Sequence, residues 1–450
     1  MSSYRVGMVS LGCPKNQMDA ELMLARLRDA GMEITAEAGL ADVVIVNTCG
    51  FIEEAKKEAI DNILEFAQLK KEGQIQKIIV TGCLAQRYQQ ELVSELPECD
   101  GVLGLGANGD IVEAVRSVMD GEKPVRFPPR ECWSLDGPRM LTTPGFFAYL
   151  RIGDGCSNRC AYCAIPLIRG PLRSRSMQAI LEEARELADG GVKELILVAQ
   201  DTTLYGVDQG SDVSEAPRLP ELLRELCRID GLRWIRMLYC YPEHMTDELL
   251  DVMAEEEKIV KYLDIPIQHC SEKVLKAMNR TGGGEALKAQ LRHIREKVPG
   301  IVLRTTVMTG FPGEGREEFE ELCSFIKEMR FERLGCFAFS PEEGTPAYTM
   351  EGQLSDKVKN RRRDIIMETQ SRIAAEYNEA QVGRTLEVLV EGYDRYAGCW
   401  FGRSAADAPD IDSKVFFTLP RGRARVKPGD MINVKITDVL DWDLIGECCS

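Results

Sequence analysis

Three cysteines near the middle of the chain have the spacing of an iron–sulfur cluster site. The run Cys156-Ser157-Asn158-Arg159-Cys160-Ala161-Tyr162-Cys163 follows a CxxxCxxC pattern, with no fourth cysteine close behind it. Three thiolates can ligate three irons of a [4Fe–4S] cube and leave the fourth iron open to a small chelating molecule. A four-cysteine site would indicate electron transfer, whereas an open iron indicates chemistry on a bound cofactor. Structural zinc is the weaker interpretation, because zinc usually takes four ligands.

A second set of three cysteines lies in the first hundred residues. Cys13, Cys49 and Cys83 are separated by 36 and 34 residues, and each stands between a short apolar run and a helical pattern. Strand-to-helix junctions of a parallel sheet lie on the same edge of that sheet, so we expect these thiols to converge. A second three-cysteine cluster is the economical interpretation, and three buried thiols at strand ends is the alternative.

The elements that must position these cysteines form two series of alternating strand and helix patterns. The first series covers residues 4–120, with helical patterns over 19–30, 53–70 and 85–95, and a linker with five prolines follows over 121–144. The second series covers 145–375 and contains six strand patterns, which fits a partial (β/α)6 barrel better than a closed eight-unit barrel. The central cysteine run follows the first of these strands, at the end where such barrels carry out chemistry.

The last part of the chain changes character. A long polar helical pattern over 355–380 is followed by short strand patterns punctuated by glycines, which predicts a small β-barrel of a partner-binding kind over 376–449. Residues 376–450 contain nine Lys or Arg and thirteen Asp or Glu, a net charge of 9 − 13 = −4. A module that grips tRNA should be basic, so this one better suits a basic protein, unless its charge serves only solubility.

Composition limits the compartment and the partners. The 450 residues carry a net charge of −16, which opposes direct nucleic-acid binding and favours a basic partner. We expect a cytoplasmic protein without membrane contact, because there is no apolar run of about 20 residues and no signal-peptide core near the start. Sixteen cysteines in a reducing compartment are then not disulfides. His244 and His293 have no partner that the sequence identifies and are expected to be packing or surface residues.

Both cysteine sets and the terminal β-module give the chain a close resemblance, over nearly its whole length, to the radical SAM (S-adenosylmethionine) methylthiotransferases. Within that family it looks most similar to the RimO branch, which modifies an aspartate of a small-subunit ribosomal protein, whereas the tRNA-modifying MiaB branch usually has Gly-Cys-Gln-Met-Asn at the first cysteine. The stretches that carry the finer resemblance are Ser10-Leu11-Gly12-Cys13-Pro14-Lys15-Asn16, Ala164-Ile165-Pro166-Leu167-Ile168-Arg169-Gly170-Pro171-Leu172-Arg173-Ser174-Arg175 and Gly402-Arg403-Ser404-Ala405-Ala406-Asp407-Ala408-Pro409-Asp410-Ile411-Asp412.

The resemblance implies a fold and a reaction. The fold is α/β, with a Rossmann-like or flavodoxin-like N-terminal cluster domain, a partial radical SAM barrel and a C-terminal TRAM barrel. The cofactors are SAM and two [4Fe–4S] clusters, one on the catalytic Cys156, Cys160 and Cys163 and an auxiliary one on the N-terminal triad. The reaction is methylthiolation of an aspartate β-carbon in ribosomal small-subunit protein twelve, with electrons from a donor such as a flavodoxin. Methylthiolation of a tRNA adenosine is the alternative, and a cluster-bearing binding protein without turnover is a third hypothesis.

The same resemblance suggests residues that contact SAM. Tyr162 precedes the third central cysteine, where family members place an aromatic side chain near the adenine, although ordinary packing explains it as well. Gln200 and Asp201 follow the second barrel strand, Gln268 follows the fourth, and Arg304 lies in the fifth. Gln200, Asp201 and Gln268 fall on the active rim of the barrel, and the Arg304 guanidinium could meet a carboxylate. A satisfied turn or an ion pair is the alternative for each of them.

Overall fold

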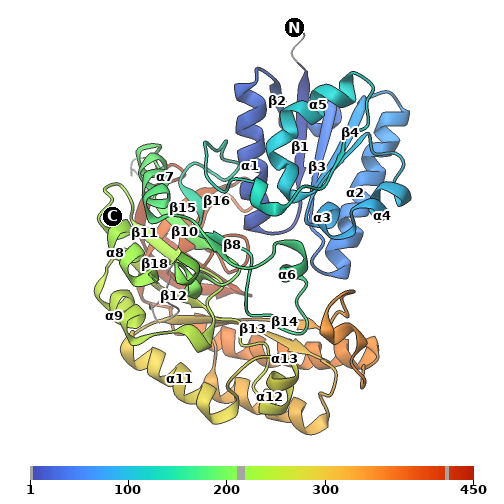
Figure 1. The fold of residues 1–450 in the computed structure, drawn as a ribbon. Coiled ribbons are helices and arrows are strands. Elements are labelled where there is room, and N and C mark those ends of the chain that lie inside the picture. Colours follow the sequence, from blue (N-terminus) through green and yellow to red (C-terminus); the bar gives the residue numbers. More distant parts are fainter. Residues whose placement is uncertain (1–3, 210–217, 421–424, 450) are drawn as a thin grey trace.

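The N-terminal cysteines follow strands of one parallel sheet. The structure, a computed structural model, describes residues 4–209, 218–420 and 425–449, and its first part holds six strands in the order β2-β1-β3-β4-β5-β6 (Figure 1). The order reverses between β1 and β3, as in flavodoxin-like folds. The elements are β1 (Arg5–Ser10), α1 (Pro14–Asp29), β2 (Glu33–Thr35), β3 (Val43–Thr48), α2 (Glu53–Lys71), β4 (Lys77–Gly82), α3 (Cys83–Tyr88), α4 (Gln90–Glu95), β5 (Gly101–Leu103), α5 (Ile111–Met119) and β6 (Val125–Arg126).

Two local features differ from the sequence pattern. The helix predicted over 85–95 is divided into α3 and α4, because Gln89 between them has a left-handed φ of 44° that no α-helix continues. The predicted linker over 121–144 contributes β6 to the sheet, and Trp133 is buried in the core beneath α1 and α5. The division of the chain at 4–120, 121–144, 145–375 and 376–449 stays a prediction.

The central part is the partial barrel that the six strand patterns predicted. Six parallel strands stand in the order β14-β13-β12-β11-β10-β7, and a short hairpin of β8 and β9 follows the first of them. The elements are β7 (Phe147–Arg151), β8 (Gly153–Asp154), α6 (Ile165–Ile168), β9 (Arg173–Ser174), α7 (Met177–Asp189), β10 (Glu194–Val198), α8 (Leu219–Cys227), β11 (Trp234–Met237), α9 (Asp247–Glu255), β12 (Ile259–Asp264), α10 (Glu272–Ala277), α11 (Gly284–Lys297), β13 (Val302–Thr309), α12 (Arg316–Met329), β14 (Arg333–Ala338) and α13 (Asp356–Glu379).

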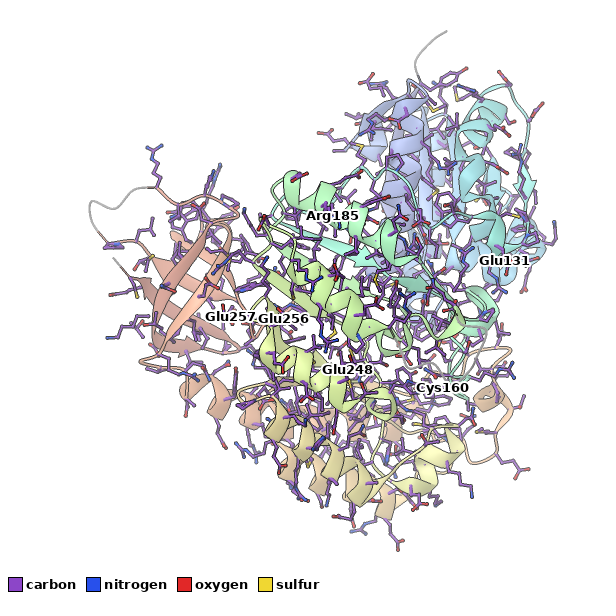
Figure 2. The ribbon with its side chains drawn as sticks, turned by 60° about the vertical axis from the view of Figure 1, so that its left-hand side comes forward. Glu131, Cys160, Arg185, Glu248, Glu256 and Glu257 are labelled. Atoms are coloured by element: carbon purple, nitrogen blue, oxygen red, sulfur yellow. The ribbon has the colours of Figure 1, made fainter. Side chains whose placement is uncertain are left out.

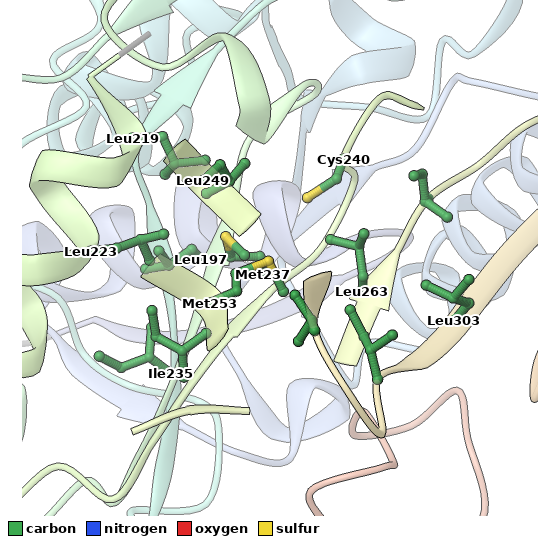
Figure 3. Packing of buried hydrophobic residues seen from close by; sticks show 14 of the residues in the cluster. Leu197, Leu219, Leu223, Ile235, Met237, Cys240, Leu249, Met253, Leu263 and Leu303 are labelled. Atoms are coloured by element: carbon green, nitrogen blue, oxygen red, sulfur yellow. The ribbon is translucent and has the colours of Figure 1, made fainter. Parts of the chain in front are cut away.

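Alternate residues of these strands face two different cores. Leu197, Ile235 and Leu263 point toward the helices and pack with side chains such as Leu223 of α8 and Met253 of α9 (Figure 3). The intervening residues form a separate apolar cluster on the inner face of the barrel, which includes Tyr149, Ile196, Val198 and Tyr262. Because a strand alternates its side chains between its two faces, strands that are buried on both faces need a second layer of structure over their inner face.

The C-terminal barrel provides that cover. Its five strands close in the order β15-β16-β17-β19-β18, and Leu389 and Ala408 join the inner apolar cluster of the core. The strands are β15 (Thr385–Asp394), β16 (Cys399–Ser404), β17 (Val415–Thr418), β18 (Met431–Leu440) and β19 (Asp443–Cys448). Among the helices of the described ranges, none is long and apolar enough to cross a membrane.

Buried charges fasten the two barrels together. Glu194 at the start of β10 is fully buried and accepts hydrogen bonds from Arg236 (2.7 Å) and from Arg403 of β16 (2.7 Å). Arg236 also donates to the carbonyl oxygen of Ala405 at 3.0 Å. Burial alone would raise the pKa of Glu194, but the two guanidinium groups outweigh it and hold that pKa below its usual range.

Replacing Glu194 should therefore loosen this junction. In Glu194→Gln two buried guanidinium groups lose their shared carboxylate, and we expect a loss of about 3–5 kcal/mol in unfolding free energy, measured in urea at pH 7. The matched control is Glu387→Gln, which breaks a largely exposed pair with Arg233 and should cost at most about 1 kcal/mol. The wild-type contribution is present above the unfolded pKa of about 4.3 and is lost as pH falls through the lower folded pKa. Equal losses in both variants would contradict this account.

Candidate cluster and cofactor site

The three N-terminal cysteines meet at the carboxyl edge of the first sheet. Cys13 follows β1, Cys49 follows β3 and Cys83 follows β4, so the first two flank the point where the strand order reverses. Open α/β sheets bind ligands at this point. Gly12 has a φ of 89°, and a Cβ added there would lie 2.9 Å from Cys49 Sγ. A Cβ on Gly50 would lie 2.7 Å from the Cα of Leu84, so the loops that carry the cysteines touch one another.

The central cysteines occupy a loop that neighbouring elements hold in place. Figure 2 shows Cys160 on the far side of the core from the C-terminal barrel. The amide of Cys156 donates to the carbonyl oxygen of Gly170 at 2.9 Å, and the amide of Ala161 donates to that of Met278 at 2.8 Å. The side chain of Asn158 donates to Asp201 Oδ2 at 2.7 Å. The loop that carries the thiols is thus anchored to the ends of β10 and α10.

Burial keeps most of these thiols neutral in the absence of a metal. It raises the pKa of Cys156 to about 11 and that of Cys83 and Cys163 to about 12, and it raises the pKa of Cys49 as well. Within each triad the cysteines repel one another's negative charge, which adds to the shift and shows that they are close. Buried thiols of this kind favour a metal in place of the proton, because a coordinated thiol is deprotonated.

A buried network of charges connects the two triads. Arg169, which follows α6, donates to Asp154 Oδ1 (3.0 Å) in the core and to Asp19 Oδ2 (2.7 Å) on α1. The same guanidinium lies 3.6 Å from Cys83 Sγ. Asp19 also accepts a hydrogen bond from Arg151 of β7 at 2.6 Å. One arginine therefore touches an N-terminal cysteine and the first core hairpin at once.

Lys15 lies between the triads as well. Its side chain is 6% exposed, and its ammonium nitrogen is 3.3 Å from the centroid of the Tyr239 ring. Tyr239 follows β11 with a φ of 61°, a left-handed conformation that is uncommon outside glycine, Asn and Asp and is typical of functional sites. Its amide donates to Asp264 Oδ2 at 3.0 Å, which holds this backbone in place.

The residues predicted to contact SAM fall into two groups. Tyr162 and Asp201 lie at the central cysteine loop: Tyr162 is a partly buried neighbour of Cys160, and Asp201 holds Asn158. Gln200 donates to Asp154 Oδ1 at 2.9 Å, while its buried Oε1 has no partner in the described chain. Arg304 is already paired with Asp264 at 2.7 Å.

Gln268 and Arg304 form the second group, whose neighbours differ from those of the central cysteine loop. The backbone of Gln268 has a φ of 65° and bridges to β13 through the amide of Met308 at 2.7 Å. Arg304 also approaches Asp412 of the C-terminal barrel, at 3.6 Å. These contacts give Arg304 a structural ion pair, and SAM binding by both residues stays a prediction.

Sequence patterns missed several side chains beside the central cysteines. His244 lies 3.0 Å from Asp201 Oδ2 and its ring stacks on Tyr241, so it belongs to the support of the cysteine loop and is no isolated surface residue. The hydroxyl of Tyr241 is 3.3 Å from Cys160 Sγ, and Arg280 covers the Tyr241 ring at 4.5 Å. No motif marks them, because the contacts join separate strand ends. His293, by contrast, pairs with Asp247 on the surface.

The donor set fits iron–sulfur clusters better than a single ion. Within the described ranges, no group of three or more His, Cys, Asp or Glu side chains has the geometry to hold one metal ion. A cube takes each thiolate on a separate iron, so its ligands need not converge on one point. The unpartnered Gln200 Oε1 adds a buried acceptor for a donor group of a bound cofactor.

Comparison with protein families gives the class of this fold and site. A model of the radical SAM superfamily matches residues 150–326, one described as uncharacterized protein family UPF0004 matches residues 5–104, and a TRAM domain model matches residues 382–449. The solved radical SAM methyltransferase TsrM from Kitasatospora setae shares the fold, with a TM-score of 0.55 at 15% identity over 77% of this chain and 74% of that chain. The half-barrel with its three-cysteine loop is thus that of a radical SAM protein.

Full-length relatives narrow the class to a family. A protein of Caldanaerobacter subterraneus named ribosomal protein uS12 methylthiotransferase RimO is 48% identical over 443 residues, which cover 98% of this chain and 99% of that protein. A protein of Pelotomaculum thermopropionicum with the same name is 48% identical over 445 residues with the same coverage. The chain belongs to the RimO family of radical SAM methylthiotransferases.

Gly12 offers a test of the N-terminal cysteine geometry. In Gly12→Ala the new methyl would meet Cys49 in a strained backbone, so we expect a loss of about 2–5 kcal/mol in unfolding free energy. The control is Gly73→Ala, which has a similar φ of 76° but nothing within 4 Å of the added Cβ, and should cost only the strain of about 1–2 kcal/mol. Denaturant unfolding of both variants measures the difference. A Gly12→Ala variant as stable as Gly73→Ala would show that the cysteine loops are not in contact.

Proposed function

We propose that this enzyme methylthiolates the β-carbon of an aspartate in ribosomal protein uS12, with SAM as methyl donor and as radical source. The observation that carries the proposal is the meeting of two separate three-cysteine sets, on two domains, at one junction spanned by Arg169. A single open cluster is enough to cleave SAM, whereas sulfur insertion also needs a place that holds the sulfur. The names of the full-length relatives supply the substrate.

The target explains why such a site is needed. The β-carbon of an aspartate side chain carries a strong, non-acidic C–H bond, which a general base cannot use. When bound to Cys156, Cys160 and Cys163, the catalytic cluster with SAM supplies a carbon radical that can remove this hydrogen. Cys13, Cys49 and Cys83 would hold the auxiliary cluster with the sulfur to be transferred. The residues for hydrogen removal and those for sulfur delivery would thus lie on the barrel and on the N-terminal sheet, respectively.

The surrounding residues serve this chemistry by holding and shielding. Asp201 orients Asn158 and with it the central loop, and the Tyr162 side chain interacts with Cys160. Arg169 places a positive charge beside Cys83, which offsets part of the negative charge that an anionic cluster would bring. Gln200 would accept a hydrogen bond from SAM through its Oε1, which has no partner in the described chain.

The charge distribution agrees with a protein substrate. The whole chain carries a charge of −16, and its last 75 residues carry 9 − 13 = −4. An acidic terminal barrel attracts a basic ribosomal protein and repels the phosphates of tRNA. We further propose a cytoplasmic enzyme that receives electrons from a reducing electron donor such as a flavodoxin.

Iron content distinguishes two clusters from one. After anaerobic reconstitution, wild-type protein should bind about eight irons per chain, four per cube. The triple variant Cys156→Ala/Cys160→Ala/Cys163→Ala should keep about four irons per chain and lose SAM cleavage. The triple variant Cys13→Ala/Cys49→Ala/Cys83→Ala should also keep about four irons per chain, but it should still release 5′-deoxyadenosine from SAM. Cys323→Ala, at a cysteine outside both triads, is the control and should keep all eight. About four irons in wild type would refute the two-cluster arrangement.

A paired substrate assay decides between protein and RNA. Reconstituted enzyme receives SAM, sulfide and a reductant, together with either a uS12 peptide containing the target aspartate or a tRNA containing isopentenyladenosine. We expect mass spectrometry to find a methylthio group on the peptide only. Modification of the tRNA alone would overturn the substrate assignment and leave the two-cluster chemistry in place.

A further inference from the structure

Lys15 is a buried lysine without an ion pair in the described part of the chain, and burial lowers the pKa of its ammonium group. Its ammonium group can donate three hydrogen bonds, yet within the described chain it makes one, to the carbonyl oxygen of Ala199 at 3.3 Å, and its other contact is the Tyr239 ring. None of the ion pairs in the described ranges includes it. A buried charge is costly unless it is paired and hydrogen-bonded, so this arrangement requires an explanation.

Its neighbours show that the junction does not generally leave cations unpaired. Arg151 and Arg169 both bind the carboxylate of Asp19, and Arg139 binds Glu21 at 3.0 Å. All three arginines are nearly as buried as Lys15 or more so. Lys15 on the first turn of α1 is therefore the exception among the buried cations that join the first domain to the barrel.

Lys15 lies close to residues of both cysteine triads. It lies two residues after Cys13, and its partner Ala199 directly follows β10, where Gln200 and Asp201 begin the supporting contacts of the central loop. Its charge acts on Cys13 on one side and on Cys163 on the other. A ligand that contacts this ammonium group is thus between the two cysteine triads.

A cavity lies beside this place and is lined by Pro14, which precedes Lys15, and by Tyr239, which Lys15 contacts. It has a volume of about 480 Å³ and is lined by Cys13, Tyr149 and Tyr239 and, from the C-terminal barrel, by Asp410. Tyr239 forms part of the cavity wall, and Lys15 lies against its ring. Asp410 contributes an acidic group to the cavity wall, which suits a basic polypeptide. Lys15 contributes a positive charge next to the Tyr239 ring.

We propose that Lys15 binds the carboxylate of the substrate aspartate and so determines that an acidic side chain is presented to the two cysteine triads. The carboxylate carbon is bonded directly to the β-carbon, so an ammonium group that holds the carboxylate also fixes the hydrogen to be removed. This inference rests on the proposed function. Lys15 is then the group that distinguishes aspartate from asparagine, its neutral isostere, which differs from aspartate only in charge and hydrogen bonding.

The test compares two uS12 peptides that differ only in aspartate or asparagine at the target position. Anisotropy of a fluorescent label gives the Kd of each peptide for the reconstituted enzyme. We expect wild type to prefer the aspartate peptide by about tenfold to a hundredfold, since hydrogen bonds to charged groups contribute about 1.5–3 kcal/mol. Lys15→Met, which keeps the length of the side chain without its charge, should bring the ratio to about one. Lys15→Arg, which keeps the charge, should retain a preference for aspartate.

Lys261→Met is the matched control. Lys261 is a partly buried lysine whose ammonium group, within the described residues, donates to backbone carbonyl oxygens such as those of Ala254 (3.2 Å) and Glu256 (3.1 Å), but it lies in the first half of β12, away from the two cysteine triads. Its loss should leave the aspartate-to-asparagine ratio unchanged. Iron content and the midpoint of thermal unfolding, measured for every variant, show whether a change in ratio reflects binding or misfolding.

Every outcome of the peptide comparison either supports or contradicts the role of Lys15 in binding the aspartate carboxylate. A wild-type enzyme without a preference, or a Lys15→Met variant that keeps it, would overturn the inference. Weaker SAM binding in Lys15→Met with an unchanged peptide ratio would assign the lysine to SAM and also overturn it. Failure of the wild type to modify either peptide would instead count against the proposed substrate, because the binding ratio is measured without turnover.

Discussion

The arrangement of this enzyme depends on one buried carboxylate. Asp19 of α1 is fully buried and accepts hydrogen bonds from Arg151 of the barrel, from Arg169 after the cysteine loop and from the indole of Trp133. Burial alone would raise the pKa of Asp19, but the two guanidinium groups hold it below its usual range. The charged form is therefore the one that joins α1 to the barrel and to the segment after the central cysteine loop.

This junction brings the N-terminal cysteines and the cysteine loop of the barrel together into one site. The N-terminal sheet alone would offer three thiols at a strand-order reversal, and the barrel alone would offer a cysteine loop at its rim. Arg169 contacts Cys83 in the first and Asp154 in the second, and Lys15 places a cation of the first domain against Tyr239 of the second. Neither domain completes the site by itself, which explains why so many charged side chains are buried where the two meet.

Much of this could be predicted from the sequence, because it depends on periodicity and on chain order. Strand and helix patterns gave the parallel sheet and the six-stranded barrel, and the rule that parallel strands end at one edge brought Cys13, Cys49 and Cys83 together. Pairings between distant elements could not be predicted. The sequence left open an ion pair for Arg304 without identifying the partner, because its pairing with Asp264 depends on the register of neighbouring strands. The partner of His244, Asp201, lies 43 residues away on another strand end.

Local geometry accounts for the other differences. Gln89 breaks a helix that its neighbours would continue, through a left-handed backbone that the composition of the segment does not reveal. Val125 and Arg126 are too short a run to register as a strand, yet they pair with β5 because the sheet edge there is open to them. Both are cases in which tertiary contacts outweigh local preference.

The C-terminal barrel has a consequence for how this family can exchange parts. Asp407 binds Arg333 of β14 at 2.7 Å, and Asp412 accepts a hydrogen bond from Tyr262 of β12 at 2.6 Å, so the segment between β16 and β17 forms part of the inner wall of the radical SAM barrel. A chimera that grafts a foreign TRAM domain at residue 382 would therefore replace side chains that pack against strands of the radical SAM barrel. Recombination that preserves these contacts has to exchange the 404–412 segment together with the strands that it contacts, so the exchangeable unit is larger than the domain.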